Sequence, residues 1–255
     1  MQVDLNSDMG ESFGSWRMGD DAALLDVITS ANIACGFHAG DADVMATTMR
    51  LAAKNGVGIG AHPGFADLQG FGRRRMKLTT EELGNMIAYQ LGAAQGMARL
   101  AGGKVRHLKL HGAVANMASE DAEIARACYQ AVLRIDPEII LITLAATASE
   151  AMARELGATY ANEIFADRAY NDDATLVDRS KPGAVLHDPA IAGPRMEQMI
   201  RAGGIITESG KLIPCRVDTI CVHGDSPDAV TMARAVRDHL TGVGISVTQF
   251  TGARA

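Results

Sequence analysis

The chain has 255 residues, a length typical of one large α/β unit. Its composition is 47% hydrophobic but only 4% aromatic, which predicts a large core built mainly from aliphatic side chains and methionine. The net charge is −6 and the one basic run is residues 73–75, so the chain lacks the basic surface that nucleic-acid binding needs. We expect a small molecule or another protein as the partner.

The patterns of secreted and membrane proteins are also missing. The 4 cysteines show no C-x-x-C spacing, which is typical of reduced thiols in a cytosolic protein. Polar residues Asp4, Asn6 and Asp8 stand where a signal peptide would be apolar. No apolar run reaches the roughly 18–20 residues of a membrane span. We expect a cytoplasmic protein that binds neither membranes nor nucleic acids.

Short extended segments alternate with amphipathic helical segments along the chain. Strands are predicted near 2–7, 29–35, 57–61, 105–111, 139–144, 158–164 and 219–223. Helices are predicted at 41–55, 79–100, 119–135, 146–156, 189–202 and 226–241. This alternation predicts a parallel sheet. Because no linker or change of composition divides the chain, we expect a single domain over residues 1–255.

Polar residues occupy only one face of several predicted strands. They are Asp4, Asn6 and Asp8 at the first strand, His107, Lys109 and His111 at the fourth, and Cys221 and His223 at the last. Successive side chains of a strand point to opposite faces, so each polar set shares a side. A parallel sheet with helices outside and polar residues inside is a barrel. Seven strands instead of eight predict an irregular, TIM-like seven-stranded parallel β/α barrel.

The predicted strand ends gather most of the histidines. Five of the seven lie there: His38, His62, His107, His111 and His223. One histidine at a strand end is more often a satisfied polar residue than a catalyst. Five of them, together with carboxylates and a lysine, indicate a reaction site, because active sites of β/α barrels assemble at the carboxyl ends of the strands.

Two long connections are rich in charge. Residues 64–75 combine glycines with three arginines and fit either a mobile loop over an anionic substrate or a solvated basic turn. Residues 164–188, which include Asp167, Arg168 and Arg179, are predicted to form a lid. No phosphate-binding glycine loop of the G-x-x-x-x-G-K-[ST] type is present.

Seven motifs in the same order resemble those of the LamB/YcsF family. They lie at residues 4–14, 30–41, 60–64, 67–74, 165–170, 179–185 and 222–225. The chain departs from the family pattern at Ala115, where a tyrosine is usual, at Ala174, where glycine is usual, and at Asp178, where proline is usual. The missing tyrosine bears on substrate detail and not on the resemblance.

The resemblance implies a barrel similar to that of metal-dependent carbohydrate deacetylases. It also implies the A subunit of an ATP-dependent 5-oxoprolinase, which works with subunits B and C to convert 5-oxo-L-proline, ATP and water into L-glutamate, ADP and phosphate. Such a reaction needs cations for phosphate, carboxylates for Mg²⁺ or for activating water, and proton donors for the leaving nitrogen. How these roles divide among the residues stays open.

The candidate residues follow from these needs. Candidate catalytic residues are Asp4, Asp8, Glu11, His62, Lys109 and His111. Candidate substrate-binding residues are Asn6, Asn32, His38, Arg73, His223 and Asp225. We expect Asp8, His38, His62, Lys109, His111 and His223 to converge at one mouth of the barrel, within about 12 Å.

Two alternatives remain at this point. Asp8, His62 and His111 are similar to the Asp-His-His metal site of the deacetylases, and with a tightly bound divalent metal they could activate water against an N-acetylated sugar without ATP. The chain could also be a non-catalytic substrate-binding subunit. The dense set of polar residues argues against that, because idle buried charges are costly.

Overall fold

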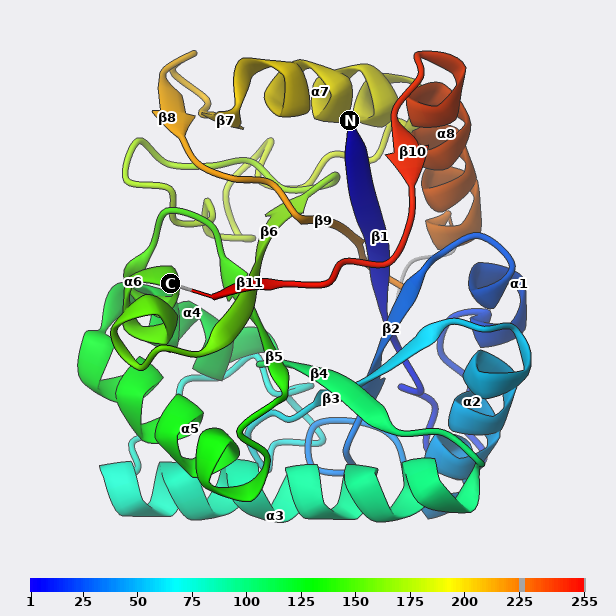
Figure 1. Cartoon of the computed structure of the whole chain (residues 1–255), viewed down its shortest axis with the longest axis vertical. Helices are drawn as coiled ribbons and strands as arrows, with labels where there is room; N and C mark the ends of the chain where they lie inside the picture. Colours follow the sequence, from blue (N-terminus) through cyan, green and yellow to red (C-terminus); the bar gives the residue numbers. More distant parts are fainter. Residues whose placement is uncertain (225–227, 255) are drawn as a thin grey trace.

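The computed structural model describes residues 1–224 and 228–254 and is built around a closed barrel of seven parallel strands (Figure 1). These strands are β1 (Gln2–Met9), β2 (Ser30–Ala34), β3 (Gly58–His62), β4 (Val105–Lys109), β5 (Ile140–Leu144), β6 (Thr159–Phe165) and β9 (Thr219–Val222). The barrel closes because β9 pairs with both β6 and β1. The register shifts between β3 and β4. The predicted irregular seven-stranded barrel is confirmed.

Helices surround the barrel (Figure 1). They are α1 (Asp21–Leu25), α2 (Ala42–Lys54), α3 (Thr80–Leu100), α4 (Gly112–Glu120), α5 (Ala122–Ile135), α6 (Ala148–Glu155), α7 (Pro189–Ala202) and α8 (Ala229–Gly242). Among the described residues, no helix combines the length and the apolar composition needed to cross a membrane.

The helix predicted at 119–135 was wrong in its extent, because two helices meet there. Helix α4 starts at Gly112, directly after β4, and α5 starts at Ala122. Between them Asp121 has an extended backbone, and its side chain accepts a hydrogen bond from the backbone N–H of Glu123. By contrast, the predicted start of α3 is confirmed: Thr79 and Glu82 form a reciprocal capping box.

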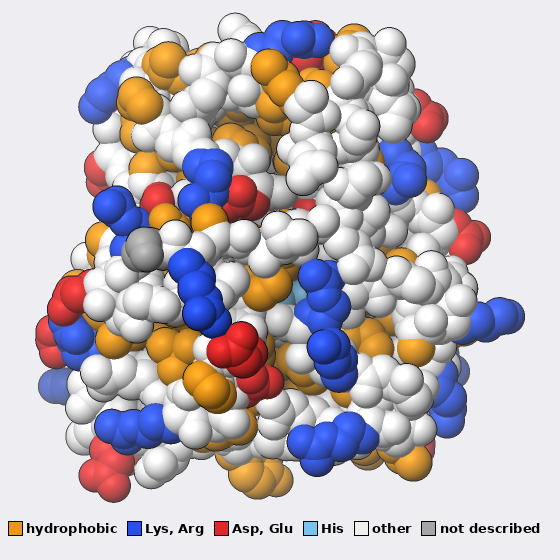
Figure 2. All heavy atoms as spheres, viewed as in Figure 1, with side chains coloured by type: hydrophobic (Ala, Val, Ile, Leu, Met, Phe, Trp, Pro, Cys, Tyr) orange, Lys and Arg blue, Asp and Glu red, His pale blue; other side chains and the backbone are white. Residues whose placement is uncertain are grey.

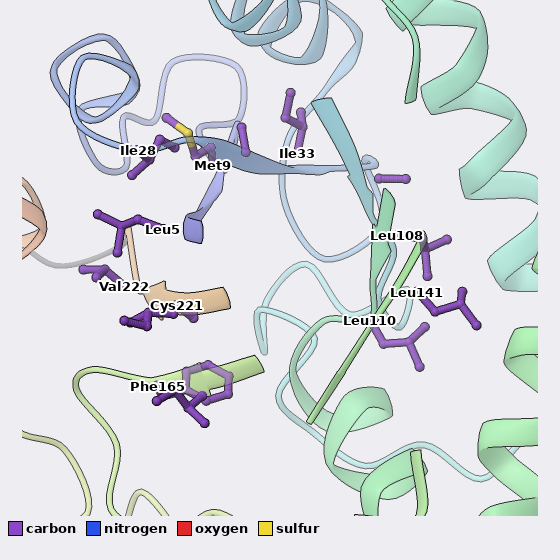
Figure 3. Close-up of a cluster of buried hydrophobic side chains, with 14 of the residues drawn as sticks. Leu5, Met9, Ile28, Ile33, Leu108, Leu110, Leu141, Phe165, Cys221 and Val222 are labelled. Carbon is purple, nitrogen blue, oxygen red and sulfur yellow. The ribbon is translucent and has the colours of Figure 1, made fainter. Parts of the chain in front are cut away.

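Large apolar side chains lie on the outward side of the barrel strands. Leu5 and Met9 of β1 and Leu108 of β4 are fully or almost fully buried. Figure 3 shows them among other apolar side chains around the strands, with Leu108 projecting toward the surrounding helices. Burying a side chain of this size stabilises the fold by about 1.5–3 kcal/mol. Because side chains alternate along a strand, the polar residues of the same strands are left to face the inside.

A C-terminal segment closes the amino end of the barrel. Its two short strands, β10 (Ser246–Val247) and β11 (Ala253–Arg254), pair with the starts of β1 and β6. In Figure 1 this segment runs in front of the barrel, and Figure 2 shows that basic and acidic side chains intermingle on the same side of the molecule. A separate hairpin joins β7 (Gly204–Ile206) and β8 (Leu212–Pro214).

Phe250 of this segment packs inside the barrel opening. It forms a buried cluster with Ile140, Ile142 and Ala161, and its ring lies 5.3 Å from the ring of His107. Arg106 fixes the segment by donating a hydrogen bond to the Phe250 carbonyl oxygen. The aromatic side chain thus separates the polar interior from solvent at the end opposite to the predicted mouth.

We expect Phe250→Ala to lower the free energy of unfolding by about 3–5 kcal/mol, because it removes a buried ring and leaves a cavity. Urea denaturation measures the change. Tyr89→Ala is the matched control, since Tyr89 is 67% exposed and its replacement should change stability by about 0.5 kcal/mol or less. Equal effects of the two substitutions would contradict the closing role of Phe250.

Candidate functional site

The inward-facing residues of the barrel form successive polar layers. The layer nearest the amino end contains Asp4, which accepts hydrogen bonds from Thr29, Ser30 and Thr219 at 2.5–2.7 Å. Burial raises the pKa of Asp4, and these hydrogen bonds oppose the rise. Asp4 does not line the cavity at the other end, because it lies four positions before Asp8 on β1, a distance of about 13 Å along the strand. The structure therefore gives Asp4 a supporting place within the barrel.

The middle layer supports the residues above it. Asn32 donates hydrogen bonds to Asn6 at 2.7 Å and to Asp8 at 3.0 Å, and its side-chain amide oxygen Oδ1 lies 3.0 Å from Nε2 of His107. The ring of His107 fits only because residue 60 on the neighbouring strand is glycine. A Cβ at Gly60 would lie 2.0 Å from Nε2 of His107. Asn6 and Asn32 are fully buried and do not line the cavity, so they orient Asp8 from below.

A cavity of about 510 Å³ opens at the carboxyl end of the barrel, within the usual size of ligand sites. The predicted site residues that line it are Asp8, Glu11, His62, Arg73, Lys109, His111 and His223. Part of the predicted lid also lines it, including Arg168 and Arg179. His38 lies behind His111, with parallel rings whose centroids are 3.6 Å apart. Asp225 lies outside the described residues.

Lys109 forms the centre of the cavity floor. Its Nζ lies 3.0 Å from Oδ1 of Asp8, 2.8 Å from Oε1 of Glu163 and 3.0 Å from Sγ of Cys221. Burial alone would lower the pKa of Lys109, but Asp8, Cys221 and Glu163 together hold it well above its usual value. The ammonium group is therefore charged and joins β4 to β1, β6 and β9.

The two carboxyl groups beside Lys109 differ in their ionisation. Burial opposes the charge of Asp8, but His62 and Lys109 outweigh it and hold the pKa of Asp8 well below its usual value. Burial raises the pKa of Glu163, and the nearby Lys109 only partly offsets the rise. Pairs of carboxyl groups with separated pKa values are typical of acid–base sites. Asp8 is suited to hold charge, and Glu163 is suited to exchange a proton.

Two histidines lie next to Asp8. Nε2 of His62 is 3.3 Å from Oδ2 of Asp8 and 2.9 Å from Nδ1 of His111. The other ring nitrogens face backbone carbonyl oxygens, that of His62 facing Lys109 and that of His111 facing Phe71, each at 2.8 Å. A carbonyl oxygen only accepts, so each of these nitrogens donates its hydrogen. In neutral rings, the two nitrogens that face each other would both be acceptors.

A group able to hold a metal ion lies at the same place. Glu11, His38, His62 and His111 each place one ligand atom within 4.8 Å of the other three. The predicted metal triad contained Asp8, His62 and His111; the group shares its two histidines and adds Glu11 and His38. Both ring nitrogens of buried His38 lack a hydrogen-bond partner among the described residues. These electron-rich donors fit a divalent cation of the zinc or manganese type.

His223 also lines the cavity, close to Asp8. Its Nδ1 lies 2.6 Å from Oδ2 of Asp167, and its Nε2 lies 3.0 Å from Nη2 of Arg179. Its ring stacks on Phe165 with centroids 5.3 Å apart. Because Arg179 only donates, Nε2 accepts and Nδ1 donates to Asp167. In this arrangement His223 holds the guanidinium of Arg179, whose N–H groups suit a carboxylate.

The six residues expected to converge do lie together. A chain of contacts joins His38, His111, His62, Asp8 and Lys109 in that order. His223 lies close to Asp8, with ligand atoms within 4.8 Å of each other. Sequence reasoning missed Glu163. Its one available signal was a carboxylate within the predicted strand 158–164, at a position that alternation places inside the barrel.

Comparison with known proteins agrees with this architecture. The LamB/YcsF family matches residues 3–255 of the chain. A Ruegeria pomeroyi protein, named as the A subunit of 5-oxoprolinase, is 68% identical over 249 residues, which cover 98% of each chain. The solved structure of a lactam utilization protein from Thermus thermophilus superposes with a TM-score of 0.92 at 41% identity, covering 98% of this chain and 100% of that one.

A more distant structure has the same fold. A family 4 carbohydrate esterase from Streptomyces lividans superposes with a TM-score of 0.51 at 12% identity, covering 100% of this chain and 96% of the esterase. At such low identity the likeness shows the fold alone. It confirms the expected similarity to the barrels of carbohydrate deacetylases.

We expect Lys109→Met to lower the free energy of unfolding by about 3–5 kcal/mol, because Asp8 and Glu163 would be left as buried carboxyl groups without their cation. Chemical denaturation measures this loss, and Lys104→Met, at an exposed lysine, is the control. The double variant Lys109→Met/Glu163→Gln should recover part of the loss. A loss below about 1 kcal/mol in the single variant would contradict the central role of the ammonium group.

Proposed function

Because the chain belongs to the LamB/YcsF family, we propose that it is the A subunit of an ATP-dependent 5-oxoprolinase. In this proposal it works with subunits B and C in the cytoplasm and converts 5-oxo-L-proline, ATP and water into L-glutamate, ADP and phosphate. The names of the Ruegeria and Thermus relatives support the substrate class. The observation in the molecule that carries the proposal is the contact of Lys109 with Asp8 and Glu163 on the floor of the cavity.

The reaction explains why such a floor is needed. A five-membered lactam recloses readily because its amine and carboxyl groups are held together, with effective molarities that can reach about 10⁵ M or more. Transfer of a phosphoryl group from ATP to the amide oxygen turns that oxygen into a leaving group. A first water then attacks the ring carbon, and the ring C–N bond breaks while the nitrogen takes up a proton, which leaves an acyl phosphate. A second water hydrolyses this acyl phosphate to the carboxyl group of glutamate and phosphate. Fixed cations and a proton-exchanging group serve each of these steps.

The residues of the cavity can be assigned to these steps. Glu163, whose pKa burial raises, exchanges protons with the attacking water and the leaving nitrogen. The ammonium of Lys109 stabilises negative charge on the amide oxygen, while ionised Asp8 keeps Lys109 in place. Arg73 and Arg179 bind the substrate carboxylate, and His223 takes part by holding Arg179 in place.

The remaining candidates take less direct parts. Asn6 and Asn32 position Asp8, and Asp225 remains a substrate-binding candidate close to His223 in sequence. Mg²⁺ enters with ATP to neutralise its phosphates. A divalent ion held by His62, His111 and neighbouring carboxylates would supply positive charge beside the cavity when bound.

The metal-compatible group supports a second candidate function, metal-dependent hydrolysis of an N-acetylated sugar without ATP. The chain shares its fold with the Streptomyces esterase, but a fold by itself does not determine a reaction. A purely substrate-binding role is the weaker alternative, since burying Lys109, Asp8 and Glu163 together is costly unless their charges are used.

We expect the isolated chain to release no glutamate from 5-oxo-L-proline. Mixed with subunits B and C, ATP and Mg²⁺, it should release glutamate together with an equal amount of phosphate. Chromatographic glutamate analysis and a phosphate assay measure both products. Deacetylation of an N-acetylated sugar by the isolated chain without ATP would instead establish the second candidate function.

We expect Glu163→Gln to lower kcat of the three-subunit enzyme by about 10²–10⁴-fold with little change in KM, because an amide cannot exchange the proton. Steady-state kinetics in the complete assembly test this. Glu81→Gln, at an exposed position of α3 away from the cavity, is the control. An unchanged kcat in Glu163→Gln would remove Glu163 from the proposed proton transfer.

A further inference from the structure

Three buried histidines, His38, His62 and His111, have ring nitrogens that lack a hydrogen-bond donor nearby. The carbonyl oxygens of Lys109 and Phe71 each take one hydrogen, from His62 and His111. In neutral rings, Nε2 of His62 and Nδ1 of His111 then face each other as lone pairs at 2.9 Å. Two acceptors at this distance repel unless a positive species lies between or beside them.

His38 adds an independent observation. It is fully buried, and neither ring nitrogen has a hydrogen-bond partner among the residues that the structure describes. Its Nδ1 side is packed against Gly64, where a Cβ would lie 2.7 Å away. Its Nε2 lies 3.9 Å from Oε1 of Glu11, too far for a hydrogen bond but close enough for both atoms to bind one ion. Burying an unsatisfied imidazole is costly, so this ring needs a partner.

A proton and a metal ion would satisfy different parts of this cluster. A proton on Nε2 of His62 would be shared with His111 or Asp8, but it would leave His38 as it is. A metal ion would accept a lone pair from all three histidines and a carboxylate oxygen from Glu11. Only the metal ion gives Nε2 of His38 a partner.

We propose that Glu11, His38, His62 and His111 form a closed four-ligand centre for a divalent ion of the zinc type, beside the reacting groups and not among them. Three imidazoles and one carboxylate suit zinc, and four protein ligands fill its usual coordination. Zinc ligands at about 2.0–2.2 Å are themselves about 3.3 Å apart. The observed donor atoms lie within 4.8 Å of one another, so the side chains must move together when the ion binds, and the stacked rings of His38 and His111 must turn toward it.

The centre would hold together the ends of four barrel strands and the segments that follow them. Glu11 follows β1, His38 follows β2, His62 ends β3, and His111 follows β4. Asp8 is left to Lys109 instead of serving as a ligand. The inference does not depend on 5-oxoprolinase activity, because its tests measure the bound metal and not turnover.

Metal content of protein purified without chelator is the first test. We expect about one zinc ion per chain, and at least a 100-fold weaker zinc affinity in His38→Gln, more than the 10–100-fold typical of groups that only support a ligand. His187→Gln, at a histidine outside the cluster, is the control. Wild-type protein that takes up no zinc even after incubation with it would overturn the proposal in favour of a shared proton.

A second test separates the closed centre from the predicted triad. Asp8→Asn should retain the ion, whereas Glu11→Gln should lose it. The opposite result would place Asp8 in the coordination shell and overturn the proposed ligand set. Circular dichroism of each variant checks that a lost ion does not reflect a lost fold.

Wild-type protein substituted with Co²⁺ tests closure without any mutation. We expect the strong visible absorption of a four-coordinate ion, and no spectral shift on titration with azide, because no coordination position is free. A shift with azide would show an open site and would overturn the closed centre.

Discussion

The buried ion pairs of Lys109 are the constraint on which the site depends. One ammonium group contacts carboxyl groups of β1 and β6 and a thiol of β9, so it ties together strands from distant parts of the sequence. Removing such charges from water is costly, and the cost is recovered only when the geometry is nearly complete. The layers beneath, from Asp4 to Asn32, supply hydrogen bonds that keep Asp8 in that geometry.

Much of the barrel could be predicted because its signal is local. Alternation of polar and apolar residues in strands β1 and β4 indicated both the closed topology and the inward direction of Asp8 and Lys109. The start of helix α4 at Gly112 was not predicted, because the helix follows the strand directly and has no polar capping residue. His111 makes no capping hydrogen bond with its side chain. The two-residue strands β10 and β11 are too short for any periodic signal.

The candidate site could be predicted in place but not in detail. The predicted strand ends indicated which residues gather at the mouth. However, Asp4 and Asp8 lie at different levels along the barrel axis, and these levels depend on the register of the strands. The proximity of Glu163 to Lys109 and the stacking of His38 on His111 are contacts between different strands and loops. Local sequence patterns contain no information on such distances, which arise from the curvature and closure of the sheet.

Closure of the sheet also has a consequence for folding kinetics. The seam between β1 and β9 joins residues 215 positions apart, as in the hydrogen bond from Ser7 to the Val222 carbonyl oxygen. Contacts of such high sequence separation form slowly, because most of the chain must be ordered before they are made. Until the seam forms, the interior charges remain hydrated, and their dehydration falls on this late step. A polar interior thus places an energetic cost on the final closure of the barrel, and we expect this late step to limit the rate of folding.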